Sequence, residues 1–418
     1  MPPRPLPSLA YEHAQNAGFL WLLRDRATSE PHYSLADLTR LDRRVEAQLD
    51  ALRLDPGLGW RAARKVLAER ERPWKIFPVA FLAFRDGDAE RVGRAVRLGT
   101  RSPAAARALA AALGWLPQSL AEPHIRALLA TGPAALRRVG IAAAAAHRFN
   151  PGAALEKSVN DPDPLLRARA LRAVGELGFP VWLPALRRHL DDPDPDCRFA
   201  AAWSAARLSP DPRAVGILQD VAFSHLPHWL EAAQVAVRRL DLPAANRWLG
   251  VLEHAPNGRR LSVQGAGILG DPAAVPRLLA AMQLPPLARA AGEALTFITG
   301  LDLDAEHLTA APPKGFRAGP TDDPKDENVT MDEDEDLPWP DPEKVAAWWA
   351  ANKSRFTEGV RYLCGQPLTD ENLQRVLREG LQRQRAAAAL ELALRQPDRP
   401  LFEVRAPGFR QQQALAAG

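Results

Sequence analysis

The acidic run from Asp332 to Asp336 is the first stretch whose side chains could do chemistry. Counted from Asp332, carboxylates stand at positions 1, 3, 5 and 12, the last being Glu343, and this is the spacing of a helix–loop–helix calcium site. Position 6, however, is Leu337 instead of the glycine that makes the turn, and three prolines stiffen the backbone that follows. The sequence therefore favours a solvated acidic loop. It leaves open that the run docks against a basic part of the same chain.

Metal-ligand sets and catalytic motifs give no further signal. His225 and His228 stand three residues apart, but no cysteine or carboxylate cluster completes a zinc-binding set. The sequence contains no Gly-rich phosphate loop, no nucleophile elbow and no HExxH motif. The two cysteines, Cys197 and Cys364, cannot form a disulfide framework, and Cys197 occupies an apolar helix position, which is typical of a core residue. We therefore expect no enzyme activity, no metal and no cofactor.

Basic and aromatic residues at matching positions of two helices offer a different chemistry, the binding of a partner. Arg169 and Arg172 lie beside the apolar stripe of one helix, and in the next helix Phe199 stands at the position of Ala168 and Trp203 at that of Arg172. Large aromatic side chains beside arginines are suited to anchoring another protein. We expect these four residues, together with Arg239, to form a partner-binding face. The alternative is that the array curls or that a terminal segment covers this face.

The element that positions these residues is a short helix within DPDPLLRARALRAVGELG, residues 161 to 178. Asp163 can cap this helix, and Pro164 fits its first turn, where a missing N–H is not needed. Apolar residues recur at helical spacing and make one narrow stripe: Leu166, Ala170, Ala173, Val174 and Leu177. A helix of about 15 residues cannot bury such a face alone, so the chain must contain further copies of it.

A ladder of arginines marks the copies. It consists of Arg107, Arg137, Arg167, Arg198, Arg259 and Arg289, in steps of 30, 30, 31, 61 and 30 residues. The segment DPDPDCRFAAAWSAARL repeats the Asp-Pro-Asp-Pro…Arg pattern, so that Asp194 and Arg198 follow Asp163 and Arg167 by 31 residues. A period of about 30 residues is typical of helical repeat arrays. The double step, near residue 229, departs from the pattern, and the array is expected to bend or repack there.

These units resemble HEAT repeats, and the Asp-Pro-Asp-Pro…Arg form is similar to the HEAT-like repeats also found in phycobilisome lyases. The resemblance implies an all-α solenoid in which the ladder arginine pairs with an acidic residue of a neighbouring unit. Carried over, it makes Arg167 and Arg198 structural joints, with Asp163 and Asp194 as their partners.

A second resemblance spans most of the chain. The strings FLWLLRDRA, LADLTRLDRRVEAQLDALR, LPWPDPEKVAAWWAANKSRF, GVRYLCGQPLT and LQRQRAAAALELAL look like a proteobacterial family of HEAT-repeat proteins with no assigned activity. Genes of that family often lie near type VI secretion loci. The resemblance therefore implies an immunity or adaptor role toward secreted effectors.

Composition and segment boundaries complete the expected organisation. The sequence predicts a HEAT-like α-solenoid with a helical N-terminal cap over residues 1–100 and a repeat array over 101–303. An acidic, Pro-rich linker is expected over 304–341 and a small helical region over 342–418, with a mostly irregular end. The formal net charge is only +4, no stretch reaches the roughly 20 apolar residues of a membrane span, and the start lacks a signal-peptide pattern. We expect a cytoplasmic location.

The expected function is a non-catalytic protein–protein interaction scaffold that binds through the concave face of the solenoid. Its partner would be another protein, such as a secreted effector of the type VI system, and the chain would act as a monomer. The alternative is a nucleic-acid-binding protein of the HEAT-like DNA glycosylase type, which the basic array supports once the acidic run is set apart. A chromophore lyase is supported only by the repeat analogy. We expect no membrane partner and do not favour nucleic acid.

Overall fold

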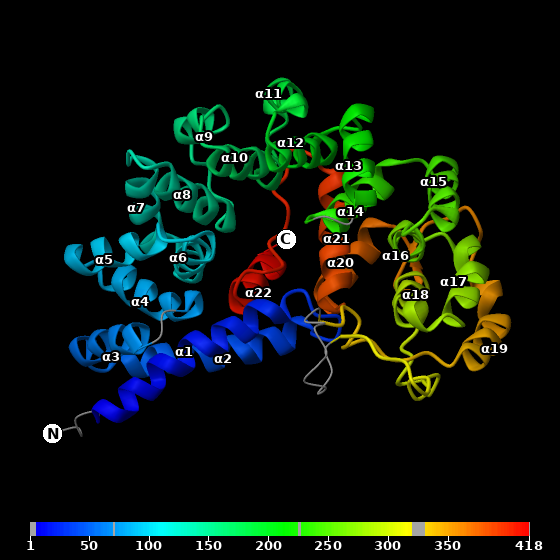
Figure 1. Cartoon of the computed structure of the whole chain (residues 1–418), viewed down its shortest axis with the longest axis horizontal. Helices are drawn as coiled ribbons and strands as arrows, with labels where there is room; N and C mark the ends of the chain where they lie inside the picture. The colour runs from blue at the N-terminus through cyan, green and yellow to red at the C-terminus, as the bar shows by residue number, and fades with distance from the viewer. Residues whose placement is uncertain (1–5, 70–71, 225–226, 320–330, 418) are drawn as a thin grey trace. The chain divides into compact units, whose positions relative to one another are not determined.

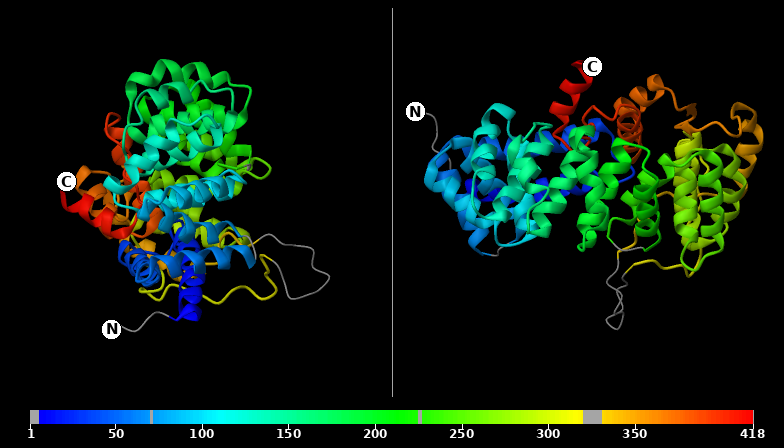
Figure 2. Two further views of the ribbon diagram at one scale, coloured as in Figure 1. Left: turned by 90° about the vertical axis from the view of Figure 1, so that its left-hand side faces the viewer. Right: turned by 90° about the horizontal axis from the view of Figure 1, so that it is seen from above.

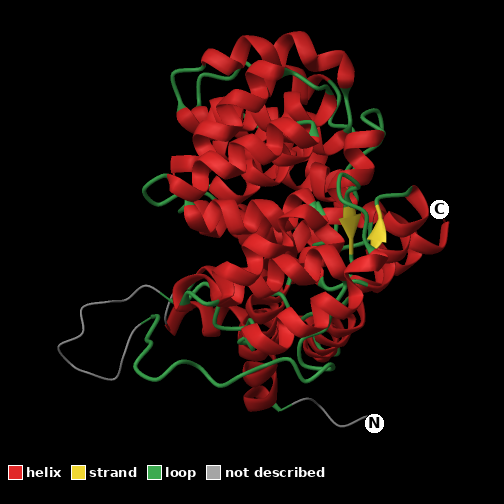
Figure 3. Ribbon diagram, turned by 90° about the vertical axis from the view of Figure 1, so that its right-hand side faces the viewer, coloured by secondary structure: helices red, strands yellow, loops and turns green. Residues whose placement is uncertain are grey.

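A computed structural model describes residues 6–69, 72–224, 227–319 and 331–417. Within these residues the fold is all-α: 22 α-helices and four short 3-10 turns stand beside a single two-stranded hairpin, Tyr362–Leu363 (β1) with Gln366–Pro367 (β2) (Figure 1; Figure 3). The expectation of a HEAT-like α-solenoid is confirmed. None of the described helices combines the length and the apolar character needed to cross a membrane.

The chain forms two compact units. Unit 1 comprises residues 1–214 and 393–418, and unit 2 comprises residues 215–392. This division cuts across the four segments expected from the sequence, because the last residues of the chain pack with the first. The boundaries fall inside helices α13 (Pro212–Ser224) and α21 (Gln382–Arg395).

Unit 1 is built from helices that stack in chain order. The even-numbered helices pack on one another in order, so that α4, α6, α8, α10 and α12 form a continuous layer. The helices are α1 (Pro7–Ala27), α2 (Leu35–Arg53), α3 (Pro56–Glu69), α4 (Pro73–Asp86), α5 (Ala89–Gly99), α6 (Pro103–Trp115), α7 (Gln118–Leu129), α8 (Ala134–Ala146), α9 (Ala153–Ser158), α10 (Pro164–Leu177), α11 (Leu183–Arg188), α12 (Pro195–Leu208) and α22 (Gly408–Ala417), with 3-10 turns η1 (Pro180–Trp182) and η2 (His189–Asp191).

The starts of α10 and α12 follow the expected capping chemistry. The Asp163 carboxylate accepts a hydrogen bond from the Leu166 N–H at 2.9 Å, and the Asp194 carboxylate accepts one from the Cys197 N–H at 2.9 Å. Such caps satisfy donors that have no partner inside the helix, and each is worth about 1 kcal/mol. Gly178 ends α10 in the left-handed region, with φ 73°, which glycine adopts without strain.

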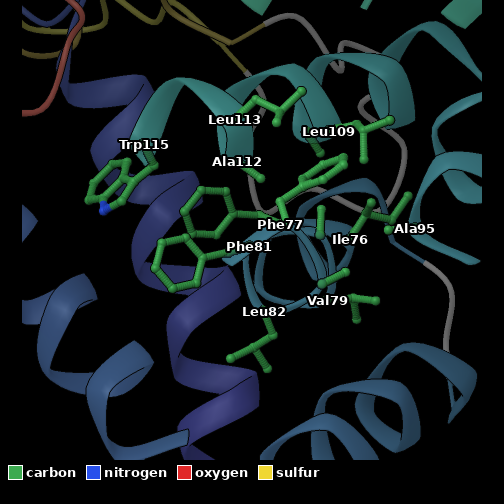
Figure 4. Packing of buried hydrophobic residues seen from close by; sticks show 14 of the residues in the cluster. Ile76, Phe77, Val79, Phe81, Leu82, Ala95, Leu109, Ala112, Leu113 and Trp115 are labelled. Atoms are coloured by element: carbon green, nitrogen blue, oxygen red, sulfur yellow. The ribbon is translucent and has the colours of Figure 1, made fainter. Parts of the chain in front are cut away.

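The core of unit 1 is densest around α4. Ile76, Phe77 and Phe81 are buried between α1 and α6, and Figure 4 shows Phe77 directed toward Trp115 of α6. Their rings lie 5.5 Å apart in an edge-to-face arrangement, which aromatic quadrupoles favour. Residues 76–84 of α4 are buried throughout.

Unit 2 repeats the stacking on a smaller scale, with α14 packed on α16 and α16 on α18. Its core includes Leu278, Leu295, Val345 and Tyr362, and Trp348 and Trp349 pack partly buried against it. The elements are α14 (Trp229–Arg239), α15 (Leu242–His254), α16 (Arg259–Leu269), η3 (Pro272–Ala274), α17 (Val275–Met282), α18 (Pro285–Thr299), α19 (Pro342–Asn352), η4 (Lys353–Arg355), the β1–β2 hairpin and α20 (Asp370–Glu379).

The end of the chain is irregular up to residue 407 and helical after it, so the expected, mostly irregular end holds only for its first half. The irregular stretch contains turns closed by the Arg399 N–H on the Gln396 carbonyl and by the Ala406 N–H on the Glu403 carbonyl, and helix α22, which follows, packs against α2 of unit 1 (Figure 1; Figure 2). We call residues 396–411 the C-terminal segment.

Candidate peptide-binding surface

Joints between successive repeats fix the helices on which the candidate surface is built. Arg167 donates to both carboxylate oxygens of Asp192, at 2.8 and 2.9 Å, and Arg137 donates to Asp161 at 2.6 Å. Asp163 and Asp194 were expected to pair with Arg167 and Arg198. This prediction is wrong, because both carboxylates cap helices instead. The acid that pairs with the arginine stands two residues before the next cap.

The Asp192 carboxylate lies at the centre of such a joint. It accepts hydrogen bonds from Arg167, from His189 and from the Asp194 N–H. Burial acts to raise the pKa of Asp192, but the hydrogen bonds and charge of Arg167 and its other donors hold it at about 2. Arg198 has a related but different role, since its guanidinium donates to the carbonyls of Asp192 and Pro193.

The expected partner-binding face does not lie open. Phe199 is 6% exposed and Trp203 is 3% exposed. The Arg172 guanidinium stacks on the Trp203 ring, 3.5 Å from its centroid. Arg169 donates to Glu176 at 2.8 Å, and Arg172 lies 3.5 Å from the same carboxylate. These side chains therefore form a covered cluster and not the expected open face: Phe199 and Trp203 are buried, and Arg169 and Arg172 are partly buried.

Glu176 is the negatively charged member of that cluster. Burial acts to raise the pKa of the Glu176 carboxyl, but the positive charges of Arg169, Arg172 and Arg148 together lower it, so the group is ionised. Its main-chain carbonyl accepts a hydrogen bond from the Leu401 N–H at 2.9 Å. Leu401 belongs to the C-terminal segment, so this segment contacts the main chain of α10 beside the cluster.

Three arginines from different parts of unit 1 bind the C-terminal segment. Arg148 donates to the Leu401 carbonyl at 2.6 Å, and Arg24 donates to the carbonyls of Arg405 and Ala406 at 2.5 and 2.6 Å. Arg207 is fully buried and donates to two further carbonyls, those of Pro397 and Arg399. All five acceptors are main-chain oxygens, so the contacts do not depend on the side chains of the segment.

Local backbone geometry lets the segment and the arginines meet. A Cβ on Gly178 would lie 2.4 Å from the Arg399 carbonyl oxygen, so only glycine leaves room for the segment there. Arg148 itself adopts a left-handed conformation, with φ 55°, which non-glycine residues rarely take. We call Arg24, Asp42, Arg148, Glu176, Gly178 and Arg207 together the segment-binding surface.

The C-terminal segment is fastened at its far end near α2 and α8. Asp42 accepts a hydrogen bond from Arg24 at 2.6 Å and another from the Gly408 N–H. The Arg410 guanidinium lies 2.9 Å from His147 Nδ1, while His147 Nε2 lies 2.9 Å from the Leu113 carbonyl. Because a carbonyl can only accept, Nε2 carries the proton and Nδ1 accepts from Arg410. Burial, then the Arg410 charge, lower the pKa of His147 to about 4.

Unit 2 carries a second such covering segment, residues 331–337, which we call the acidic segment. Arg260 donates to both carboxylate oxygens of Asp334, at 2.9 and 2.6 Å. Arg289 donates to the Asp332 carboxylate at 2.6 Å and to the Asp334 carbonyl at 2.7 Å, and it lies under the Trp339 ring. The acidic run therefore docks on a basic part of the same chain, as the sequence left open.

The remaining candidate residues have separate surroundings. Arg239, at the end of α14, is half-buried, and burial lowers its pKa against the opposing attraction of Glu391. Its neighbour Arg238 is buried 3.1 Å from Glu391. His228 lies 3.6 Å from Glu231, whereas His225 is outside the described residues. Across residues 6–69, 72–224, 227–319 and 331–417, no three histidine, cysteine or carboxylate groups gather as a metal would require.

Comparison with known proteins agrees with this geometry. Residues 152–238 match the family model described as HEAT repeats. This stretch is a HEAT-like repeat array. The HEAT-like array contains the second half of the segment-binding surface, from Glu176 to Arg207.

A crystal structure of an engineered protein from the Northeast Structural Genomics Consortium is similar at 14% sequence identity and a TM-score of 0.32, over 68% of this chain and 93% of that one. No curated protein matches the chain.

The sequence did not single out Arg24, Arg148 or Arg207. Each lies at or just beyond the last turn of its helix, α1, α8 or α12. Arginines there are favoured by the helix dipole in any case, so their positions carry no signal of segment binding.

Proposed function

We propose that this chain is a non-catalytic scaffold that binds another protein by holding a non-helical stretch of it on the segment-binding surface. The observation that supports the proposal is the binding of five main-chain carbonyls, at residues 397, 399, 401, 405 and 406, by three arginines. Charge-assisted hydrogen bonds to a main chain give affinity without demanding a particular side chain. HEAT repeats, which match residues 152–238, commonly mediate interactions between proteins.

The cluster of side chains around Glu176 contributes to the proposed binding indirectly. Arg169 and Arg172 hold the Glu176 side chain, and Phe199 and Trp203 form the floor beneath Arg172. We propose that these four residues position the Glu176 carbonyl for the main-chain N–H of a bound segment. Arg239 stays a proposed partner contact of unit 2.

The finer identity of the partner rests on the resemblance to the proteobacterial family. It supports a monomeric, cytoplasmic immunity or adaptor protein whose partner is a type VI secretion effector. Copurification of the chain with effectors encoded beside its gene tests this identity. An Arg148→Ala chain should retain less than about a tenth of the wild-type yield of partner, and equal yields would contradict the proposed surface.

A defined peptide tests the binding function itself. The receptor is the full chain carrying Arg410→Ala, which removes the bonds of α22 to His147 and to the Ala146 carbonyl. We expect it to bind a labelled peptide of residues 396–417. Adding Arg148→Ala should weaken that binding about tenfold, because the donor to the Leu401 carbonyl and the partner of Glu403 are lost.

The matched control is Arg94→Ala in the same receptor, since Arg94 pairs with Glu90 on the exposed surface of α5. It should leave peptide affinity unchanged. Circular dichroism melting establishes that every receptor is folded. Equal affinity in the Arg148→Ala and Arg94→Ala receptors would refute the proposal.

A further inference from the structure

Gly408, in the C-terminal segment, packs closely against α2. A Cβ at this position would lie 2.3 Å from Thr39 Oγ1 and 3.1 Å from Thr39 Cα. The hydroxyl cannot easily move aside, because Thr39 is buried and donates to the Leu35 carbonyl at 2.8 Å. Any side chain larger than hydrogen would therefore displace α22 from α2.

The Gly408 main chain is also bound directly. Its N–H donates to Asp42, and Asp42 in turn accepts from Arg24, the donor to the Arg405 and Ala406 carbonyls. The buried Arg24–Asp42 ion pair thus binds both residues 405–406 and Gly408, the first residue of α22. Arg24 is 4% exposed and Asp42 is 1% exposed.

The side chains of residues 398–400 contact the surface much less. The side chains of Asp398, Arg399 and Pro400 are exposed, and the contacts there are made to main-chain atoms. Glu403, farther along the segment, pairs with an arginine of the surface, lying 3.2 Å from Arg148. Selectivity is therefore concentrated at Gly408 and not at residues 398–400.

We infer that the partner segment is a non-helical stretch that ends in a glycine at the start of a short helix, and that the C-terminal segment competes with it in cis. This inference rests on the proposed function and adds the class of ligand and its competitor. A partner lacking the glycine would meet Thr39, whereas substitutions at the positions of residues 398–400 would be tolerated.

Peptide discrimination tests the inference. The receptors are full chains carrying Arg410→Ala or Gln411→Ala, because Gln411 binds the carbonyls of Val404 and Ala406 and its loss also loosens the segment. The probes are labelled peptides of residues 396–417 with the natural sequence, with Gly408→Ala, or with Pro400→Ala. Affinity is measured by fluorescence anisotropy, and folding by circular dichroism.

We expect the Gly408→Ala peptide to bind at least about tenfold more weakly than the natural peptide, and the Pro400→Ala peptide to bind within about twofold of it. The wild-type chain should bind the natural peptide more weakly than either receptor, because its own segment occupies the surface.

The outcomes separate the two proposals. If the natural peptide binds neither receptor, the proposed function fails. If it binds, but Gly408→Ala binds equally well, the function stands and the glycine requirement is overturned. Equal binding by the wild-type chain and both receptors would overturn competition in cis.

Discussion

The C-terminal segment on unit 1 and the acidic segment on unit 2 both cover arginines, but they offer those arginines different acceptor groups. Each covers arginines of stacked repeat helices. On unit 1 these arginines donate to neutral main-chain carbonyls, as Arg207 does to Pro397 and Arg399. On unit 2 they pair with carboxylates, as Arg260 does with Asp334.

The difference concerns what each surface can distinguish. A main-chain carbonyl is present at every residue, so the unit 1 contacts recognise a backbone conformation. Carboxylates are present only in Asp and Glu, so the unit 2 contacts recognise a sequence. Unit 1 is therefore the better surface for exchanging one polypeptide for another, and unit 2 is the better surface for keeping its own segment.

The largest expected effect comes from Gly178→Ala, which acts on the unit 1 side of the comparison. The new Cβ meets the Arg399 carbonyl oxygen at 2.4 Å, in addition to the strain of φ 73°. We expect a loss of about 3 kcal/mol in the free energy of unfolding, measured with denaturant. Gly87→Ala is the control, because Gly87 has φ 70° and nothing within 4 Å, and it should lose only about 1 kcal/mol. Equal losses would show that the segment does not bear on Gly178.

Arg289→Met makes the corresponding break on unit 2. Arg289 is 6% exposed, and its loss leaves the Asp332 carboxylate and the Asp334 carbonyl without this donor. Stability should fall by about 2 kcal/mol, and hydrogen exchange should accelerate in residues 331–337 but not in 397–406. Arg277→Met, which removes a half-exposed pair with Glu253, should cost about 0.5 kcal/mol or less. Faster exchange in residues 397–406 would contradict the independence of the two segments.

Acid separates the C-terminal segment from the repeat joints. The pKa of His147 is lowered from 6.5 to about 4, so the unfolded chain binds more protons there than the folded chain. The stability from neutral His147 is thus complete above pH 6.5 and is lost as the pH falls through 4. For Asp192 the corresponding loss begins below 3.8 and continues through about 2. Urea midpoints between pH 7 and 4 should fall less steeply in His147→Gln, and an unchanged slope would exclude His147 as the cause.

Salt should give the smallest effect. The Arg260–Glu333 pair at 3.3 Å is partly exposed, whereas the carbonyl contacts of unit 1 join a charge to a neutral group. Raising sodium chloride to about 1 M shortens the screening length to about 3 Å. Hydrogen exchange should therefore accelerate by about twofold in residues 331–337 and remain constant in residues 397–401, whose main-chain carbonyls accept from Arg207 and Arg148. Equal acceleration in both would remove the electrostatic distinction.

The sequence predicted the features that depend on neighbouring residues. Capping by Asp163, its repetition at Asp194 and the repeat period were readable from residue types and spacing. The burial of Phe199 and Trp203 was not, because it depends on how α10 packs on α12: Arg172 lies over both rings, and a Cβ on Gly175 would meet Trp203. Repeat spacing places a side chain on a helix face but says nothing of what arrives to cover that face.

The missed partner of Arg167 has a simpler cause. Asp192 and Asp194 are two residues apart in the same turn, and both are within reach of an arginine by spacing alone. Only the direction of each carboxylate, one toward the guanidinium and one toward the helix N–H groups, separates the joint from the cap.

The bond from Arg24 to the Arg405 carbonyl joins residues 381 positions apart. During synthesis, α1 and α2 therefore emerge long before the stretch that finishes their packing exists. Over that interval Arg24 and Asp42 have each other but not Ala406 or Gly408. Contacts of such high sequence separation form late and slowly. A nascent chain would thus present an unoccupied segment-binding surface, and a partner present at that time would meet no competitor.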